Sequence, residues 1–164
     1  MKGKFIFFIL LTLLISNCKK SNSSDQVNCN GLVTDTAGTG DNGRVFMPTA
    51  FTPNGDGLND LVRPQTQNIS SLEFTVYDET NKIVFTSSTI GESWNTTAAA
   101  NTMTQYYFRV QATTAANHKI GLCGQLFKLT CLPTGLPISN YRFEDQFTAD
   151  GFTGVTNENL ATCH

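Results

Sequence analysis

The sequence is poor in the residues that most catalytic and nucleic-acid-binding sites require. Only two histidines occur among 164 residues, His118 and His164, so there is little material for histidine-based proton transfer or metal ligation. Eleven basic residues stand against 13 acidic ones, without the basic excess of a nucleic-acid-binding protein. The chain has no Gly-x-Ser-x-Gly elbow, no phosphate-binding loop and no cysteine pair at zinc-site spacing. We therefore expect a protein that is not an enzyme and has no nucleic-acid partner.

The chain is rich instead in the residues of strands and turns. Hydrophobic residues make up 40% of the sequence and charged residues 15%, which is typical of a chain that can fill a packed core. Thirteen glycines, with many threonines and asparagines, favour turns and extended segments. Outside the N-terminal segment no stretch keeps helical periodicity, so the pattern predicts an all-β sandwich.

One hairpin can be placed from the pattern alone. Residues 72–77 alternate between apolar and polar side chains, with Leu72, Phe74 and Val76 on one face. A turn of four polar residues separates them from a second apolar segment at residues 83–85. Further strands are predicted at residues 44–47, 105–112 and 125–131.

The N-terminus has the features of an export signal. Lys2 and Lys4 precede an apolar run at residues 5–15, which is too short to cross a hydrocarbon core of about 30 Å but suits a signal peptide. The run leads into Ser-Asn-Cys, which resembles a bacterial lipobox ending at Cys18. We expect a lipoprotein signal peptide at residues 1–17 and an acyl chain on Cys18 that anchors the protein in outer-membrane lipid. An ordinary signal peptide followed by an incidental cysteine is the alternative.

The cysteine count supports this interpretation. Five cysteines are present, and an odd number in an exported protein leaves one thiol unexplained. With Cys18 lipidated, Cys29, Cys123, Cys131 and Cys163 can form two disulfides. If Cys123 and Cys131 share one extended strand, eight residues hold them roughly 26 Å apart, too far for a mutual bond. Each of them then pairs with Cys29 or Cys163, and the order of the two pairs stays open.

Composition divides the mature chain into three parts. Residues 18–43 are rich in Ser, Asn, Asp, Thr and Gly, and we expect a lipid-anchored polar tether. Residues 44–131 contain the predicted strands of the sandwich. Residues 132–164 are expected to form a C-terminal extension that packs on the domain and is stapled to it by a disulfide.

Residues 47–60, called here the signature segment, read MPTAFTPNGDGLND. The segment resembles the opening of the gliding motility-associated C-terminal domain, the type B sorting domain of type IX secretion cargo. The resemblance continues through residues 72–77 and 83–85, Trp94 and the Tyr106–Tyr107 pair to Gly124 and the strand after it. It implies an Ig-like antiparallel β-sandwich and a link to type IX secretion or gliding.

The sequence departs from the family at its end. The family domain ends its host protein, whereas about 33 residues follow Cys131 here. We therefore expect an exported, outer-membrane lipid-anchored accessory or interaction module, on either membrane face, with secretion or gliding proteins as partners. The alternative is a glycan- or ligand-binding lipoprotein, for which Trp94, Tyr106 and Tyr107 would have to form an exposed platform.

The signature segment also suggests a cation. Asn54, Asp56, Asn59 and Asp60 place four oxygen-bearing side chains within seven residues, and two glycines between them permit a tight turn. Calcium takes six to eight oxygen ligands, so these four are a candidate structural calcium loop. The alternative is a turn in which the Asn and Asp side chains bind their own backbone.

Overall fold

The computed structural model describes residues 29–97, 102–148 and 150–164. Its strands are β1 (Arg44–Phe46), β2 (Ala50–Phe51), β3 (Gln65–Gln67), β4 (Ile69–Tyr77), β5 (Ile83–Ser87), β6 (Met103–Thr114), β7 (Lys119–Leu129), β8 (Phe147–Thr148) and β9 (Gly151–Phe152), with short 3-10 turns η1 (Ile138–Asn140) and η2 (Glu144–Gln146). The fold is all-β, as predicted. Within the described ranges no helix has the length and apolar character needed to cross a membrane.

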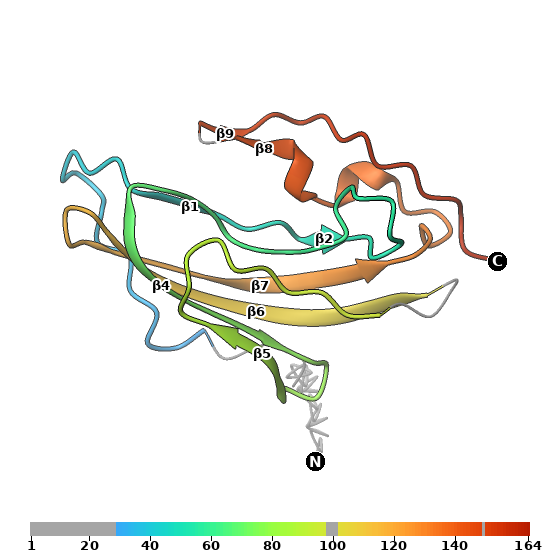
Figure 1. Cartoon of the computed structure of the whole chain (residues 1–164), viewed down its shortest axis with the longest axis horizontal. Coiled ribbons are helices and arrows are strands. Elements are labelled where there is room, and N and C mark those ends of the chain that lie inside the picture. The colour runs from blue at the N-terminus through green and yellow to red at the C-terminus, as the bar shows by residue number, and fades with distance from the viewer. Residues whose placement is uncertain (1–28, 98–101, 149) are drawn as a thin grey trace, which may run out of the picture.

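The strands form layers (Figure 1). The main layer is a five-stranded sheet in the order β2-β7-β6-β4-β5, antiparallel except for the parallel β2–β7 pair. The β1–β3 pair lies over one face of this sheet, and the β8–β9 hairpin of the extension lies beyond β1. The β4–β5 hairpin confirms the pairing predicted for residues 72–77 and 83–85.

Asparagines make three of the turns between strands. Asn68 joins β3 to β4, Asn81 lies between β4 and β5, and Asn117 lies between β6 and β7, all with positive φ. Asparagine tolerates this left-handed conformation better than most residues with a side chain. The high asparagine content is therefore used to reverse the chain at the sheet ends.

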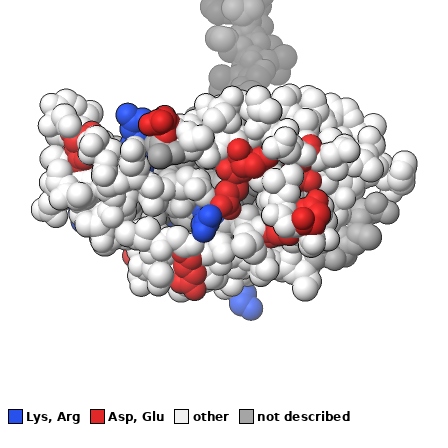
Figure 2. All heavy atoms as spheres, turned by 45° about the horizontal axis from the view of Figure 1, so that its top comes forward, with Lys and Arg blue, Asp and Glu red and all other residues white. Residues whose placement is uncertain are grey.

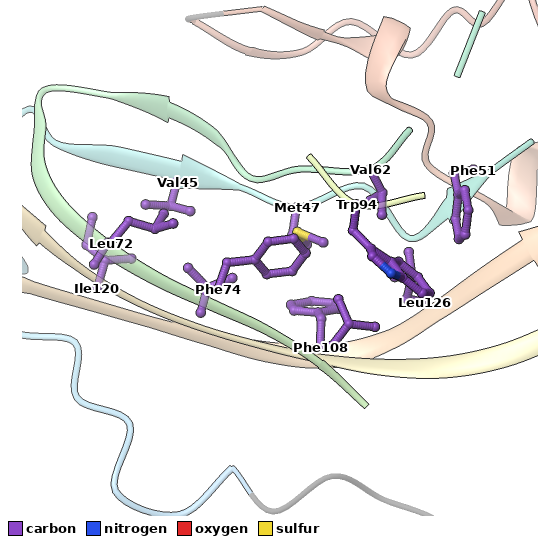
Figure 3. Packing of buried hydrophobic residues seen from close by; sticks show 13 residues of the cluster. Val45, Met47, Phe51, Val62, Leu72, Phe74, Trp94, Phe108, Ile120 and Leu126 are labelled. Carbon is purple, nitrogen blue, oxygen red and sulfur yellow. The ribbon is translucent and has the colours of Figure 1, made fainter. Parts of the chain in front are cut away.

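The core lies between the main sheet and the covering layer (Figure 3). Leu72, Phe74 and Phe108 point up from the main sheet, and Val45 and Trp94 come from the covering side. The ring centroids of Trp94 and Tyr106 are 4.9 Å apart in an edge-on arrangement, which adds specific aromatic contact to the burial. Alternation along β4 and β6 thus puts one face of each strand into the core.

The segment predicted to be a tether differs from that prediction where the structure describes it. Thr34 Oγ1 accepts the Gly121 N–H at 3.0 Å, and the Asp35 N–H donates to the Lys119 carbonyl at 3.1 Å. A Cβ placed on Gly121 would lie 2.8 Å from the Leu32 Cβ. The chain docks here because Gly121 leaves room for it on the outer face of β7, which composition alone does not reveal.

The C-terminal extension packs on the end of the main sheet. Tyr141 and Phe143 are buried in a second apolar cluster with Ala50 and Leu129. The ring of Phe147, further along, lies 6.0 Å from that of Phe46 between centroids. The Cys131–Cys163 disulfide joins the end of the extension to the last residue of the predicted domain, which confirms that a disulfide staples the extension to it.

Candidate functional site

The signature segment leads into and out of β2. Ala50 and Phe51 pair with Phe127 and Lys128 of β7, which fixes the segment to the main sheet. Phe51 is fully buried and its ring centroid lies 5.4 Å from that of Trp94. The buried strand therefore carries the polar residues that follow it, from Thr52 onward, to the edge of the core.

The loop after β2 is closed by its own side chains. The two carboxylate oxygens of Asp60 accept the backbone N–H groups of Gly55, at 2.7 Å, and Gly57, at 2.8 Å. Asp56 Oδ1 accepts the Leu58 N–H at 2.8 Å, and Asn54 Oδ1 accepts the Asp56 N–H at 3.0 Å. This is the arrangement of a turn held by Asn and Asp side chains.

The fourth candidate calcium ligand points elsewhere. Asn59 has φ 53°, is buried, and turns its amide away from the loop. Its Oδ1 accepts the Asp145 N–H at 3.1 Å and its Nδ2 donates to Glu158 at 3.0 Å. In the described part of the chain no group of three or more His, Cys, Asp or Glu side chains is placed to hold a metal ion. The geometry therefore favours the structural turn over the calcium loop.

Glu158 reaches the signature segment from the far end of the chain. Its Oε2 accepts both the Thr52 hydroxyl, at 2.6 Å, and the Asn59 amide. The Glu158 residue is only 7% exposed, and Thr52 is fully buried. No local pattern in the sequence marks this glutamate, because its contact with Thr52 spans 106 residues.

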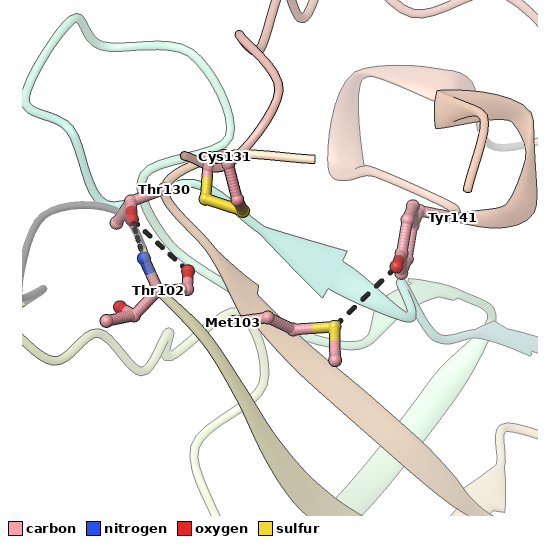
Figure 4. The surroundings of a disulfide bond; sticks show 6 residues. Thr102, Met103, Thr130, Cys131 and Tyr141 are labelled. Atoms are coloured by element: carbon pink, nitrogen blue, oxygen red, sulfur yellow. Dashed lines mark hydrogen bonds between the residues drawn. A yellow bond between two sulfur atoms is a disulfide. The ribbon is translucent and has the colours of Figure 1, made fainter. Parts of the chain in front are cut away.

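The extension also covers the outer edge of β2 (Figure 4). The Arg142 carbonyl accepts the N–H groups of Thr49, at 2.7 Å, and Ala50, at 3.0 Å, and the Arg142 N–H donates to Thr49 Oγ1. The Tyr141 hydroxyl lies 3.7 Å from the Met103 sulfur. The extension therefore protects a strand edge that would otherwise be free to pair with another chain.

An open cavity of about 650 Å³ lies beside the loop. Asp60, Glu144 and Asp145 contribute carboxylates to its lining, and Arg63 pairs with Glu144 at 2.8 Å. Figure 2 shows acidic side chains across this side of the molecule, with few basic ones between them. The carboxylates here are engaged with neighbouring groups of the fold, so the cavity has no evident catalytic pair.

Residues 45–123 match the family model of the CHU_C type IX secretion signal domain. This region is similar to a type IX secretion signal domain, and it is called the signal domain below. This finding confirms the resemblance carried by the signature segment, and it places the protein among exported proteins of the cell envelope. No curated protein and no solved structure matches the chain.

The aromatic residues of the signal domain serve its core. Trp94 and Tyr107 are 7% and 2% exposed, and Tyr106 packs against the main cluster. The pKa of Tyr106 is raised, first by burial and then by the nearby carboxylates of Asp78 and Glu79. The exposed platform that glycan binding would need is therefore not formed by these three residues.

The disulfides tie both flanks of the signal domain to it. Cys29 bonds to Cys123 on β7, and Cys131 bonds to Cys163. This is one of the two pairings that the strand-length argument leaves open. Cys18 and the predicted signal peptide lie outside the described residues.

A second polar cluster holds the N-terminal flank. Asp41 Oδ2 accepts the Thr114 hydroxyl and lies 2.8 Å from His118 Nδ1. The Thr114 hydrogen bond, followed by the Gly43 N–H and His118, lowers the pKa of Asp41. Thr114 contacts the carboxylate and the backbone N–H of His118, so no hydroxyl–imidazole pair of a nucleophilic site forms. No motif in the sequence predicts this cluster, since Asp41 and His118 are 77 residues apart.

Proposed function

We propose that the protein is a non-enzymatic lipoprotein of the outer membrane that acts as an accessory module of type IX secretion or gliding. The match of residues 45–123 to the secretion signal domain carries this proposal. Contact with the secretion or gliding machinery would give this region a use that agrees with the match.

The C-terminal extension supports an accessory role over that of ordinary cargo. It is bonded across the signature segment by Arg142 and Glu158 and stapled by a disulfide. The extension therefore covers the part of the signature segment around β2, while residues 54–57 stay exposed. A domain with this strand edge covered suits a resident component better than a delivery tag.

The absence of an enzymatic function is part of the proposal. The described residues bring no nucleophile, base and orienting group together. His118 is bound to Asp41, Glu144 to Arg63, and Asp60 to loop backbone. The three carboxylates that line the cavity beside the loop, Asp60, Glu144 and Asp145, thus have structural partners, which supports a binding or scaffolding role.

The anchor is tested by labelling and fractionation of the full chain in its native host. Wild-type protein is expected to take up a palmitate analogue and to fractionate with outer membranes. Cys18→Ala is expected to lose the label and leave the membrane, while Cys29→Ala serves as the cysteine control that keeps both. Unlabelled, soluble wild-type protein would refute the anchor.

A further inference from the structure

The distal arm of the extension, residues 150–164, is held mainly by polar contacts, among them hydrogen bonds from Thr153 to the Gln146 carbonyl and from Thr156 and Asn157 to Asp145. Glu158 is the one residue of this arm that is buried. The end of the arm is fixed by the Cys131–Cys163 disulfide and by two backbone hydrogen bonds with Leu132. The Leu132 N–H donates to the Ala161 carbonyl at 2.8 Å, and the Cys163 N–H donates to the Leu132 carbonyl at 2.8 Å. Opening the disulfide would therefore leave Glu158 as the arm's one buried side chain, beside the hydrogen bonds of Thr153, Thr156 and Asn157.

The place where Glu158 inserts has the features of a small binding site. Thr52 is fully buried and Asn59 is 8% exposed, and both aim a hydrogen-bond donor at the same carboxylate oxygen. The orientation of the Asn59 amide is fixed independently, because its oxygen accepts the Asp145 N–H. Two preset donors in a buried position select a carboxylate without any contribution from the arm's other side chains.

The contact is also easy to exchange. The donors to Glu158 are a neutral hydroxyl and a neutral amide, so no cation offsets the loss of water around the buried carboxylate. A carboxylate from another chain would meet the same donors. The Glu158 carboxylate of the arm occupies the site in preference to a carboxylate from another chain, because the disulfide keeps it at a high effective concentration.

We propose that Thr52 and Asn59 form a binding site for a glutamate side chain of an extended peptide, that Glu158 occupies this site within the chain, and that the Cys131–Cys163 disulfide controls access to it. A dithiol reductant opens the staple: the S–S bond receives two electrons, each sulfur gains a proton, and the dithiol becomes a disulfide. The Glu158 carboxylate then exchanges with that of an acidic peptide, which the site accepts in its place. This inference does not depend on the proposed function in secretion.

Peptide binding to the full chain tests the proposal. The probe is a labelled peptide with the sequence of residues 154–161, and its control carries glutamine in place of glutamate. The glutamate peptide is expected to bind C131S/C163S roughly tenfold or more tightly than oxidised wild type, and to shift the NMR signal of the Asn59 side-chain amide. C29S/C123S, which keeps the arm stapled, is expected to behave like wild type.

Equal binding to wild type and C131S/C163S, or equal binding of the two peptides, would overturn the proposal. Chemical rescue provides a second test that keeps the staple intact. Glu158→Ala is expected to gain thermal stability from sodium propionate beyond the effect of sodium chloride at equal ionic strength, and T52V/E158A is expected to gain none. Absence of rescue in folded Glu158→Ala would contradict the carboxylate site even if C131S/C163S does not fold.

Discussion

The carboxylate of Glu158 lies 2.6 Å from the hydroxyl of Thr52, across 106 residues of sequence. This contact joins the last segment of the chain to the segment that identifies its family. It couples the stability of the signature segment to the extension, although the family match ends at residue 123.

Glu158→Ala removes the shared acceptor and leaves the Thr52 hydroxyl and the Asn59 amide buried without it. A buried donor that loses its acceptor costs about 1–3 kcal/mol, so we expect a loss of roughly 2 kcal/mol in the free energy of unfolding. Glu158→Gln keeps an oxygen that can accept both bonds but loses the charge that strengthens them, so its loss should be smaller than that of Glu158→Ala without vanishing. Urea unfolding at pH 7 measures both, and equal losses would contradict the assigned contacts.

Asp41→Asn tests the N-terminal polar cluster through pH. The pKa of Asp41 is lowered by the Thr114 hydroxyl, the Gly43 N–H and His118, so its ionised form stabilises the folded state. That stabilisation is present above the ordinary aspartate pKa of about 3.9 and is lost as the pH falls through the lowered value. We expect Asp41→Asn to be less stable than wild type at pH 7 and to lose less on acidification. Asp78→Asn is the control for the loss of a carboxylate elsewhere in the fold. The pKa of Asp78 is also lowered, but by hydrogen bonds from Thr80 and Lys82 within a separate turn. Parallel pH profiles for wild type and Asp41→Asn would refute the prediction.

Removal of each disulfide should lower the free energy of unfolding, and the two losses should differ. The Cys29–Cys123 bond spans 94 residues and the Cys131–Cys163 bond spans 32. Chain-entropy arithmetic gives a stabilisation of about 5 kcal/mol for the longer loop and about 4 kcal/mol for the shorter. C29S/C123S should thus lose at least as much stability as C131S/C163S in denaturant titrations. The reverse order would show that native contacts of the extension, and not loop closure, dominate.

Gly121→Ala should detach the docked segment at residues 29–36. The added methyl group would meet the Leu32 Cβ at 2.8 Å and the Val33 backbone at 3.1 Å. Such crowding costs about 1–3 kcal/mol, and it should raise amide exchange at Asp35 and Gly121. Gln125 is an exposed position on the same strand, so Gln125→Ala should change neither the stability nor the amide exchange at these two residues. Unchanged exchange in Gly121→Ala would contradict the docking.

The features that sequence could predict are local ones. Alternation at Leu72, Phe74 and Val76 with a short polar turn was enough to place the β4–β5 hairpin. The signature segment was enough to identify the family, because its residues are consecutive. The strand-length rule likewise excluded a bond between Cys123 and Cys131 from separation alone.

The features that sequence could not predict depend on contacts between distant residues. The docking of residues 29–36 depends on the missing side chain of Gly121, and a polar composition looks the same whether a segment is docked or free. Asn59 sits among the loop's oxygen-bearing residues in sequence, but its positive φ turns it toward Glu158. The calcium interpretation treated four neighbours as one group, and the fold divides them.

The central claim, that the protein is an accessory module of the secretion or gliding machinery, is tested most directly by its partners. The full chain, tagged after His164, would be purified from gently solubilised outer membranes of its native host, and the associated proteins identified by mass spectrometry. Cys18→Ala, purified in the same way, controls for proteins that associate only through the membrane. The account predicts enrichment of type IX secretion or gliding components with the wild-type chain. Recovery of only polysaccharide-processing proteins, or of no specific partner, would contradict it.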